Sequence, residues 1–353
     1  MNIRTNIAKL SSSFFLSRGF FLGLFLFSVN SAWAGVYSDH PKAQQFIEEM
    51  VRDHQFDAEQ LQRWFDQVER KQSVLDAIAR PAEKVKEWKE YRPIFVTPSR
   101  IEQGVAFWRA NADILAKAER DFGVPQSIIV AILGVETRYG AHTGGFRVMD
   151  SLSTLAFDYP PRSPFFRKEL KEFLLLAREQ EKSPLDLTGS YAGAMGFGQF
   201  MPSSYRAYAH DYDGDGFTDI WQNPVDAVGS IANYFVRHGW NSGEPVVVRA
   251  RVNERFDASL LEDSLKPERS LADVKQAGFS PVAENPLPEP VRVFQLQGEL
   301  GAEFWLAMHN FYVITRYNRS TMYALAVYQL AESVEQAYSA QQAEDKTTQI
   351  GEL

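Results

Sequence analysis

A largely apolar helix that carries one acid near its end is the feature that most restricts this fold. The run SIIVAILGV follows Pro125, which favours a helix start, and Gly140 favours the helix end. So apolar a helix has to be buried by neighbouring elements. The composition, with 45% apolar and 23% charged residues, agrees with a folded globular chain. We therefore predict a mainly helical α+β protein with a buried helix at residues 125–139.

The acid on this helix is Glu136. Ile129, Ile132 and Leu133 precede it by seven, four and three residues and share its helix face, so the carboxyl projects from an apolar side. Burial disfavours the ionised form, and the negative end of the helix dipole acts in the same direction. We expect a raised pKa and a carboxyl that stays protonated near neutral pH, as a general acid requires. The alternative is a structural ion pair with Arg138 or another cation.

A glycine-rich segment, GSYAGAMGFGQFMPSSY, spans residues 189–205. Four glycines fall within its first ten residues, and glycine lets a ligand approach the backbone closely. The interleaved side chains offer hydrogen bonds from Ser190, Gln199 and Ser203 and flat apolar faces from Tyr191, Phe197 and Phe200. Sugars need both kinds of contact, because their edges are polar and their faces carry C–H groups. The segment is typical of a saccharide site, and a tightly packed structural loop is the alternative.

Two further stretches carry polar groups in loops. Tyr317 and Asn318 stand just before a helical pattern that Ser320 can cap, so Asn318 is either a turn residue or a binding group. Residues 211–226, DYDGDGFTDIWQNPVD, contain D-x-D-x-D-G, the front half of an EF-hand calcium loop. That pattern assigns ligand positions to Asp211, Asp213 and Asp215, to the carbonyl of Phe217 and, through water, to Asp219. Position 12 departs from the pattern, since it is Gln222. The crowded oxygen ligands favour Ca²⁺, and a solvated acidic turn is the alternative.

The N-terminus has the three parts of a secretory signal peptide. Basic residues precede the apolar run FFLGLFLFSV and an Ala-x-Ala site, which predicts cleavage after Ala34. An N-terminal membrane anchor is the alternative. Cleavage would remove three positive charges and no negative one, so the net charge would change from −8 to −11. That balance argues against nucleic acid or anionic lipid as a partner. Because the chain has no cysteine, neither disulfides nor a lipid-modified cysteine is available. We expect a soluble periplasmic protein without a membrane anchor.

Residue patterns along the chain predict its secondary structure and its domains. Periodicity and capping signals indicate helices at 41–51, 57–68, 99–120 and 163–182. Alternation in EPVVVRARVNERF and PVRVFQLQG indicates two strands, and the chain is predicted to be helical again from 302 to about 338. The predicted segments are a signal peptide at 1–34, an N-terminal helical region at 35–122, a core at 123–242, a small β-containing insert at 243–298, a helical return at 299–340 and a flexible tail at 341–353.

Three motifs together resemble one family. GVETRYG, the glycine-rich segment and RYNRSTMYALAVYQL are similar to the B-type lytic murein transglycosylases, a bacterial cell-wall family with a lysozyme-like core, across roughly residues 40–335. The resemblance implies cleavage of the β-1,4 bond between N-acetylmuramic acid and N-acetylglucosamine, which leaves a 1,6-anhydromuramoyl end. The single catalytic glutamate of the family corresponds to Glu136. Its substrate-binding residues correspond to Ser190, Gln199, Tyr317, Asn318, Tyr234, Tyr323 and Tyr91.

The resemblance also bears on cofactors and partners. The family's calcium loop ends in an acid that corresponds to Asp226, and its chemistry does not use the metal, so the Ca²⁺ is expected to be structural. No organic cofactor is implied. Peptidoglycan strands are the expected partner, wall-synthesis proteins are candidates, and a monomer is the default.

Other functions fit parts of the sequence. A hydrolytic muramidase would need a second carboxylate, for which Asp150 and Asp158 are candidates, although capping or turn roles are expected for both. A non-catalytic peptidoglycan-binding scaffold and a calcium sensor are the remaining alternatives. Glu136 in combination with the polar loop residues favours an enzyme over a scaffold, and a single unpaired calcium loop argues against a sensor.

Overall fold

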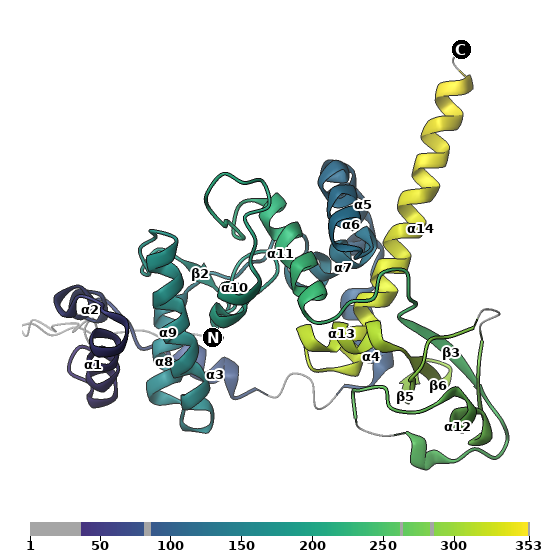
Figure 1. Cartoon of the computed structure of the whole chain (residues 1–353), viewed down its shortest axis with the longest axis horizontal. Coiled ribbons are helices and arrows are strands. Elements are labelled where there is room, and N and C mark those ends of the chain that lie inside the picture. The colour runs from purple at the N-terminus through teal and green to yellow at the C-terminus, as the bar shows by residue number, and fades with distance from the viewer. Residues whose placement is uncertain (1–36, 81–85, 262–263, 283–285, 352–353) are drawn as a thin grey trace, which may run out of the picture. The chain divides into compact units, whose positions relative to one another are not determined.

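The computed structural model (Figure 1) describes residues 37–80, 86–261, 264–282 and 286–351. They all belong to one unit of the chain. The signal peptide predicted at 1–34 lies outside the described residues. Within the described part of the chain, no helix combines the length and the apolar character needed to cross a membrane.

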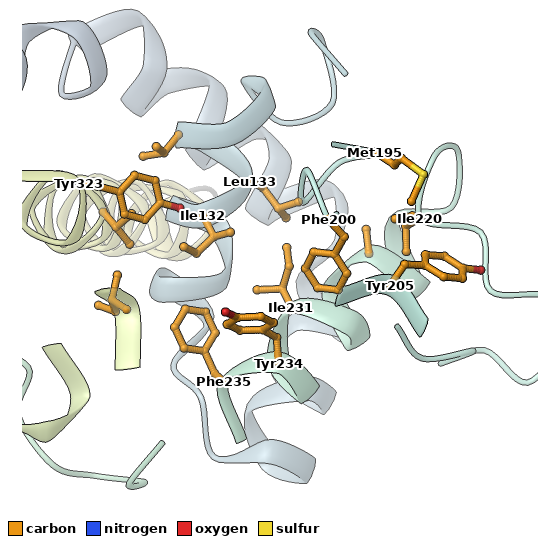
Figure 2. Close-up of a cluster of buried hydrophobic side chains, with 14 of the residues drawn as sticks. Ile132, Leu133, Met195, Phe200, Tyr205, Ile220, Ile231, Tyr234, Phe235 and Tyr323 are labelled. Atoms are coloured by element: carbon orange, nitrogen blue, oxygen red, sulfur yellow. The ribbon is translucent and has the colours of Figure 1, made fainter. Parts of the chain in front are cut away.

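The predicted apolar helix forms and lies at the centre of a helical group. This helix, α7 (Gln126–Thr137), is buried at every residue except Gln126 and Glu136. Four helices pack against it and account for that burial: α5 (Pro98–Ala110), α6 (Ala112–Phe122), α11 (Pro224–Arg237) and α14 (Thr321–Gly351). Figure 2 shows part of this interior, where Ile132 and Tyr323 lie close together. The prediction of a buried central helix in a mainly helical α+β fold is confirmed.

A second group of helices is built on α8 (Val148–Asp158) and α9 (Ser163–Glu179), which pack together across the 3-10 turn Pro160–Arg162. The rings of Phe46, Phe65 and Phe157 form a cluster with centroids 6.0–6.2 Å apart, and this cluster joins two N-terminal helices to α8. The other helices of the group are α1 (Pro41–His54), α2 (Ala58–Phe65), α3 (Gln72–Ile78) and α10 (Pro202–Tyr208). The helices predicted at 41–51, 57–68 and 163–182 are confirmed within a few residues.

Four strands between residues 247 and 307 form an antiparallel sheet in the order β4-β3-β6-β5, which extends beyond the insert predicted at 243–298. It has its own apolar cluster, which includes Val274, Phe279 and Leu306. The strands are β3 (Val247–Val252), β4 (Phe279–Pro281), β5 (Arg292–Gly298) and β6 (Gly301–Ala307), with the helix α12 (Leu271–Gln276) and the 3-10 turn Ala258–Leu260 between β3 and β4. Both predicted strands are therefore present. Helix α13 (His309–Tyr317) then leads the chain from the sheet to α14.

Three predictions of local structure are wrong. Residues 99–120 form two helices, because the Asn111 side chain donates a 2.8 Å hydrogen bond to the Phe107 carbonyl and ends α5 there. The chain from 302 is a strand, since β6 pairs with β3 and β5 on its two sides, and tertiary pairing of this kind decides the state of a short segment. The tail is helical to Gly351, where helix-forming residues extend α14 and Arg109 makes a 2.6 Å ion pair with Asp345. The domain boundaries themselves stay predictions.

Candidate active site

Glu136 lies in the last turn of α7 and is half-buried. The phenol of Tyr323, in the first turn of α14, donates a 2.6 Å hydrogen bond to Glu136 Oε1. Burial and the nearby charge of Glu136 both raise the pKa of Tyr323, so this phenol keeps its proton and acts as a donor. The carboxyl therefore projects from an apolar helix into a partly covered site, as predicted.

The end of α7 is fixed against the glycine-rich segment. Thr137 Oγ1 donates to the Phe197 carbonyl at 2.9 Å and accepts from the Gly140 N–H at 3.0 Å. Arg138 and Tyr139 adopt left-handed backbone conformations, with φ of 50° and 60°, which turn the chain sharply away from the helix. These contacts determine where the neighbouring Glu136 carboxyl lies relative to the segment.

The glycine-rich segment begins at a two-stranded sheet made by β1 (Phe146–Arg147) and β2 (Thr188–Gly189). Gly144 precedes β1 with φ of +95°, and a Cβ there would lie 2.2 Å from the Gly189 carbonyl oxygen. Only glycine permits this close approach of two backbones. The tight contact anchors the segment just before Ser190.

Gly144→Ala is expected to lower the free energy of unfolding by about 1–3 kcal/mol or more, because the strained φ and the backbone clash both oppose the native structure. Gly145→Ala is the matched control, since nothing lies within 4 Å of a Cβ there, and it is expected to stay within about 0.5 kcal/mol of the parent. Chemical denaturation of both variants measures the difference. Equal stability of the two would contradict the close approach.

Ser190 and Gln199 both take part in the internal structure of the segment. Ser190 Oγ accepts from the N–H groups of Ala192 and Ala194 at 3.3 and 3.0 Å, which leaves its hydroxyl hydrogen available to a ligand. The Gln199 amide nitrogen donates 3.0 Å bonds to the carbonyls of Thr143 and Gly196, and its backbone has φ of 50°. The amide oxygen of Gln199 has no hydrogen-bond donor among the described residues. Each side chain thus keeps one polar function that the internal hydrogen bonds of the segment do not use.

Tyr317 and Tyr234 join α13 and α11 to the same region. Tyr317 Oη donates to the Gly198 carbonyl at 2.6 Å, and a Cβ on Gly198 would lie 2.8 Å from the phenolic oxygen of Tyr317. Burial and the charge of Glu136 raise the pKa of Tyr317. Tyr234 Oη donates to the Arg316 carbonyl at 2.6 Å, and the two tyrosine rings meet edge to face at 4.8 Å. Figure 2 shows Tyr234 beside Phe235, Ile231 and Phe200.

Tyr91 and Asn318 complete the predicted set. Tyr91 is buried in α4 (Trp88–Phe95), which packs on α14, and it lies near enough to Tyr323 to contribute to the raised pKa of that phenol. Asn318 follows α13 as its C-cap, is half-buried, and its side-chain amide makes no hydrogen bond to another described residue. The amide is available to a ligand at the junction of α13 and α14.

The acids and the cation considered as alternatives are engaged elsewhere. Arg138 donates to Gln103 and Ser99 at 3.2 and 3.3 Å. Asp150 is buried and pairs with Arg147 at 2.8 Å, and Asp158 pairs with Arg70 at 3.3 Å. Both carboxylates are therefore held in ion pairs, whereas capping or turn roles were expected for them.

The acidic loop brings three carboxylates together. One oxygen each of Asp211, Asp213 and Asp226 lie within 4.8 Å of one another, and Asp226 is fully buried in the first turn of α11. Burial raises the pKa of Asp226, and the charges of Asp213 and Asp211 raise it further. None of the three forms an ion pair with a lysine or arginine among the described residues. A buried carboxylate beside two others, without a basic partner, fits an oxygen-liganded Ca²⁺ site.

Three residues assigned by the EF-hand pattern lie outside this group, Asp215, Phe217 and Asp219. The Asp215 carboxylate accepts from the Phe217 N–H at 2.8 Å, and the Phe217 side chain is 48% exposed. Asp219 accepts from the N–H groups of Trp221 and Gln222. Asp215 and the carbonyl of Phe217 stay predictions as ligands, whereas Asp226 is placed with the first two aspartates.

Comparison with known proteins identifies the family of the chain. A family described as transglycosylase SLT domain matches residues 38–332, and the chain belongs to this family. It is a peptidoglycan lytic transglycosylase with a lysozyme-like α+β fold. Membrane-bound lytic murein transglycosylase B of Escherichia coli is 44% identical over 309 residues, which cover 85% of this chain and 84% of the relative.

Solved structures of two relatives show the same fold. Soluble lytic transglycosylase SltB1 of Pseudomonas aeruginosa is 56% identical, with a TM-score of 0.81 over 85% of this chain and 100% of that one. The E. coli lytic transglycosylase Slt35 is 44% identical, and its structures in complex with bulgecin A and with calcium have TM-scores of 0.80 and 0.79. Each covers 87% of this chain and 96% of that one.

One residue that positions the site was not predicted. Thr137 connects α7 to the glycine-rich segment, although it lies directly after Glu136 in the sequence. A hydroxyl in the last turn of an apolar helix was the available signal, because such a group must find a partner once it is buried.

Proposed function

We propose that this enzyme cleaves the β-1,4 bond between N-acetylmuramic acid and N-acetylglucosamine, with Glu136 acting first as an acid and then as a base. The product would carry a 1,6-anhydromuramoyl end. The observation that supports this most is the half-buried Glu136 carboxyl held by Tyr323 at 2.6 Å, while Asp150 and Asp158 are engaged in ion pairs elsewhere. A lone acid suits a reaction that needs no separately activated water.

The proposed reaction has two proton transfers at one carboxyl. Protonated Glu136 gives its proton to the glycosidic oxygen as the bond to C1 breaks. The substrate's own N-acetyl group stabilises the positive anomeric carbon, as in substrate-assisted glycosidases. Ionised Glu136 then takes the proton from the C6 hydroxyl of the muramic residue as that oxygen attacks C1. The nucleophile is part of the same sugar, so its effective concentration is high.

The other residues are proposed to hold the glycan. The hydroxyl of Ser190, the amide oxygen of Gln199 and the amide of Asn318 would bind polar edges of the sugars. Four tyrosine rings are proposed to line the glycan-binding groove and to shield the Glu136 carboxyl partly from water. They belong to Tyr91, Tyr234, Tyr317 and Tyr323. Peptidoglycan strands are the proposed substrate.

Product masses test the reaction. Digestion of purified murein should give fragments lighter by one water than the corresponding reducing-end fragments, because the C6 hydroxyl replaces water as the nucleophile. Reducing ends would instead identify a hydrolytic muramidase. Murein left intact by the purified wild-type protein would identify a non-catalytic scaffold.

Tyr323→Phe is expected to lower kcat/KM at pH 7 by about ten-fold, which corresponds to the loss of one hydrogen bond to a charged group. A hydrogen bond donated to a carboxylate favours its ionised form, so its loss should move the alkaline limb of the pH–rate profile to higher pH. Tyr328→Phe is the matched control, because that phenol donates to the exposed Glu332 at 2.6 Å on the same helix. A profile that moves to lower pH, or does not move, would argue against Tyr323 as the partner of the catalytic acid.

We further propose that the acidic loop binds a structural Ca²⁺ through Asp211, Asp213 and Asp226, and that the chain acts in the periplasm after cleavage following Ala34. The grouped carboxylates support the first statement, and the arrangement of residues 1–34 supports the second. N-terminal sequencing of the exported protein should begin at Gly35. A retained N-terminus would favour the membrane-anchor alternative.

A further inference from the structure

A cavity of about 580 Å³ is lined in part by the acidic loop. Next to this lining, the Ile220 carbonyl accepts a hydrogen bond from the Phe197 N–H of the glycine-rich segment. Its lining includes Trp221 and Phe217, together with amide and hydroxyl side chains such as Gln180 and Thr188. Glu136 is not part of this lining. The cavity therefore has no role in the proton transfers described above.

The lining has the chemistry of a saccharide site. Phe217 is 48% exposed, and Trp221 is half-buried. Trp221 Nε1 donates to the Thr188 carbonyl at 3.1 Å, and Tyr205 packs against the indole with the ring centroids 5.6 Å apart. These contacts fix the indole as a rigid platform. Aromatic faces with a few polar groups around them are what a sugar ring requires.

The charges of the lining argue against an anionic ligand. Lys182 contributes a positive charge to the lining, and Asp186, Asp215 and Asp219 contribute negative ones. The carboxylates of Asp215 and Asp219 accept backbone N–H groups of the acidic loop. The excess of carboxylates disfavours an anion, and carboxylate oxygens can accept hydrogen bonds from the hydroxyls of an uncharged sugar ring.

Hydrogen bonds connect the cavity rigidly to the end of α7. Thr137 Oγ1 donates to the Phe197 carbonyl at 2.9 Å, and the Phe197 N–H donates to the Ile220 carbonyl at 2.9 Å. Ile220 immediately precedes Trp221, and Thr188 on the cavity wall stands two residues before Ser190. A glycan strand is a long polymer, so a strand held near Glu136 can extend to a platform placed at a fixed position beyond it.

We infer that this cavity is a second glycan-binding site, in which Trp221 and Phe217 stack on a sugar of the strand remote from the bond that is cut. This inference rests on the proposed function, because it requires a glycan strand in the site of Glu136. It predicts a site that increases affinity for long strands without changing the chemical step.

The test is the length dependence of oligosaccharide binding, measured by calorimetry with β-1,4-linked N-acetylglucosamine oligomers of increasing length. The Glu136→Gln form is used so that no oligomer is cleaved. Affinity should increase with length, and Trp221→Leu in this background should remove that increase, with about ten-fold weaker binding of long oligomers and unchanged binding of the shortest. Trp64→Leu is the matched control, since Trp64 is also half-buried but does not line this cavity.

Asp186→Ala gives a second variant with little risk to folding, because Asp186 is exposed, and it should weaken binding of the long oligomers alone. Unchanged length dependence in both variants would overturn the inference, as would an affinity of the Glu136→Gln form that does not increase with length. Cleavage of murein by the wild-type enzyme to anhydro products is measured separately. The proposed reaction can therefore stand or fail independently of the second site.

Discussion

Glu136→Gln is expected to abolish murein cleavage while leaving the fold intact. Glutamine has nearly the same shape, and its amide oxygen can still accept the hydrogen bond from Tyr323, so folding should be normal. The variant has no transferable proton, and general acid–base groups contribute about 10²–10⁴-fold each to a rate. Release of soluble fragments from purified murein measures the loss, and circular dichroism with thermal unfolding verifies the fold.

Glu332→Gln is the matched control for this experiment. Glu332 also accepts a 2.6 Å hydrogen bond from a tyrosine, Tyr328, but it is exposed on α14 and has no place in the proposed chemistry. The control should cleave murein at the wild-type rate. If the Glu136 variant retained activity within a few-fold of wild type, the assignment of the acid would be refuted.

Calcium removal is expected to have the second largest effect, and the effect is on stability. Asp226 is fully buried beside Asp211 and Asp213, so their mutual repulsion is uncompensated once a cation is withdrawn. A ligand at 100 times its dissociation constant stabilises the folded state by about 2.7 kcal/mol, and chelation removes that amount. EDTA should therefore lower the melting temperature, while the rate at low temperature should change little because the metal takes no part in the proton transfers.

Asp226→Asn should make the melting temperature insensitive to both EDTA and added calcium. Asp76→Asn is a suitable control, because Asp76 is exposed on α3 and lies outside the acidic loop, so its response to calcium should match that of wild type. A wild-type melting curve that neither chelation nor added calcium shifts would eliminate the metal site.

The sequence was sufficient for the features that local patterns determine. The run around Ile129 and Leu133 identified the buried helix because apolar residues on every side can only be interior. Asp57 and Ser320 were recognisable as caps, and each accepts the N–H three residues ahead. The motif resemblance assigned Tyr317 and Tyr323 to the same site as Glu136, and burial together with the charge of Glu136 raises the pKa of both phenols.

Features that depend on partners remote in the chain were not predictable in this way. The strand at Gly301–Ala307 forms because two other strands flank it, and the sequence of the segment itself does not predict those neighbours. The break at Asn111 depends on one side chain bonding the preceding turn. The cavity beside Trp221 combines the end of α9 with the acidic loop, which no linear pattern joins.

The bond from Tyr323 to Glu136 spans 187 positions of the chain. The carboxyl is made early and its phenolic partner late, so the two meet only when the C-terminal helix has docked on the rest. A polypeptide interrupted ahead of α13 would present the acid without this partner and without Tyr317. The surroundings of the acid are thus completed only by the last two helices of the chain.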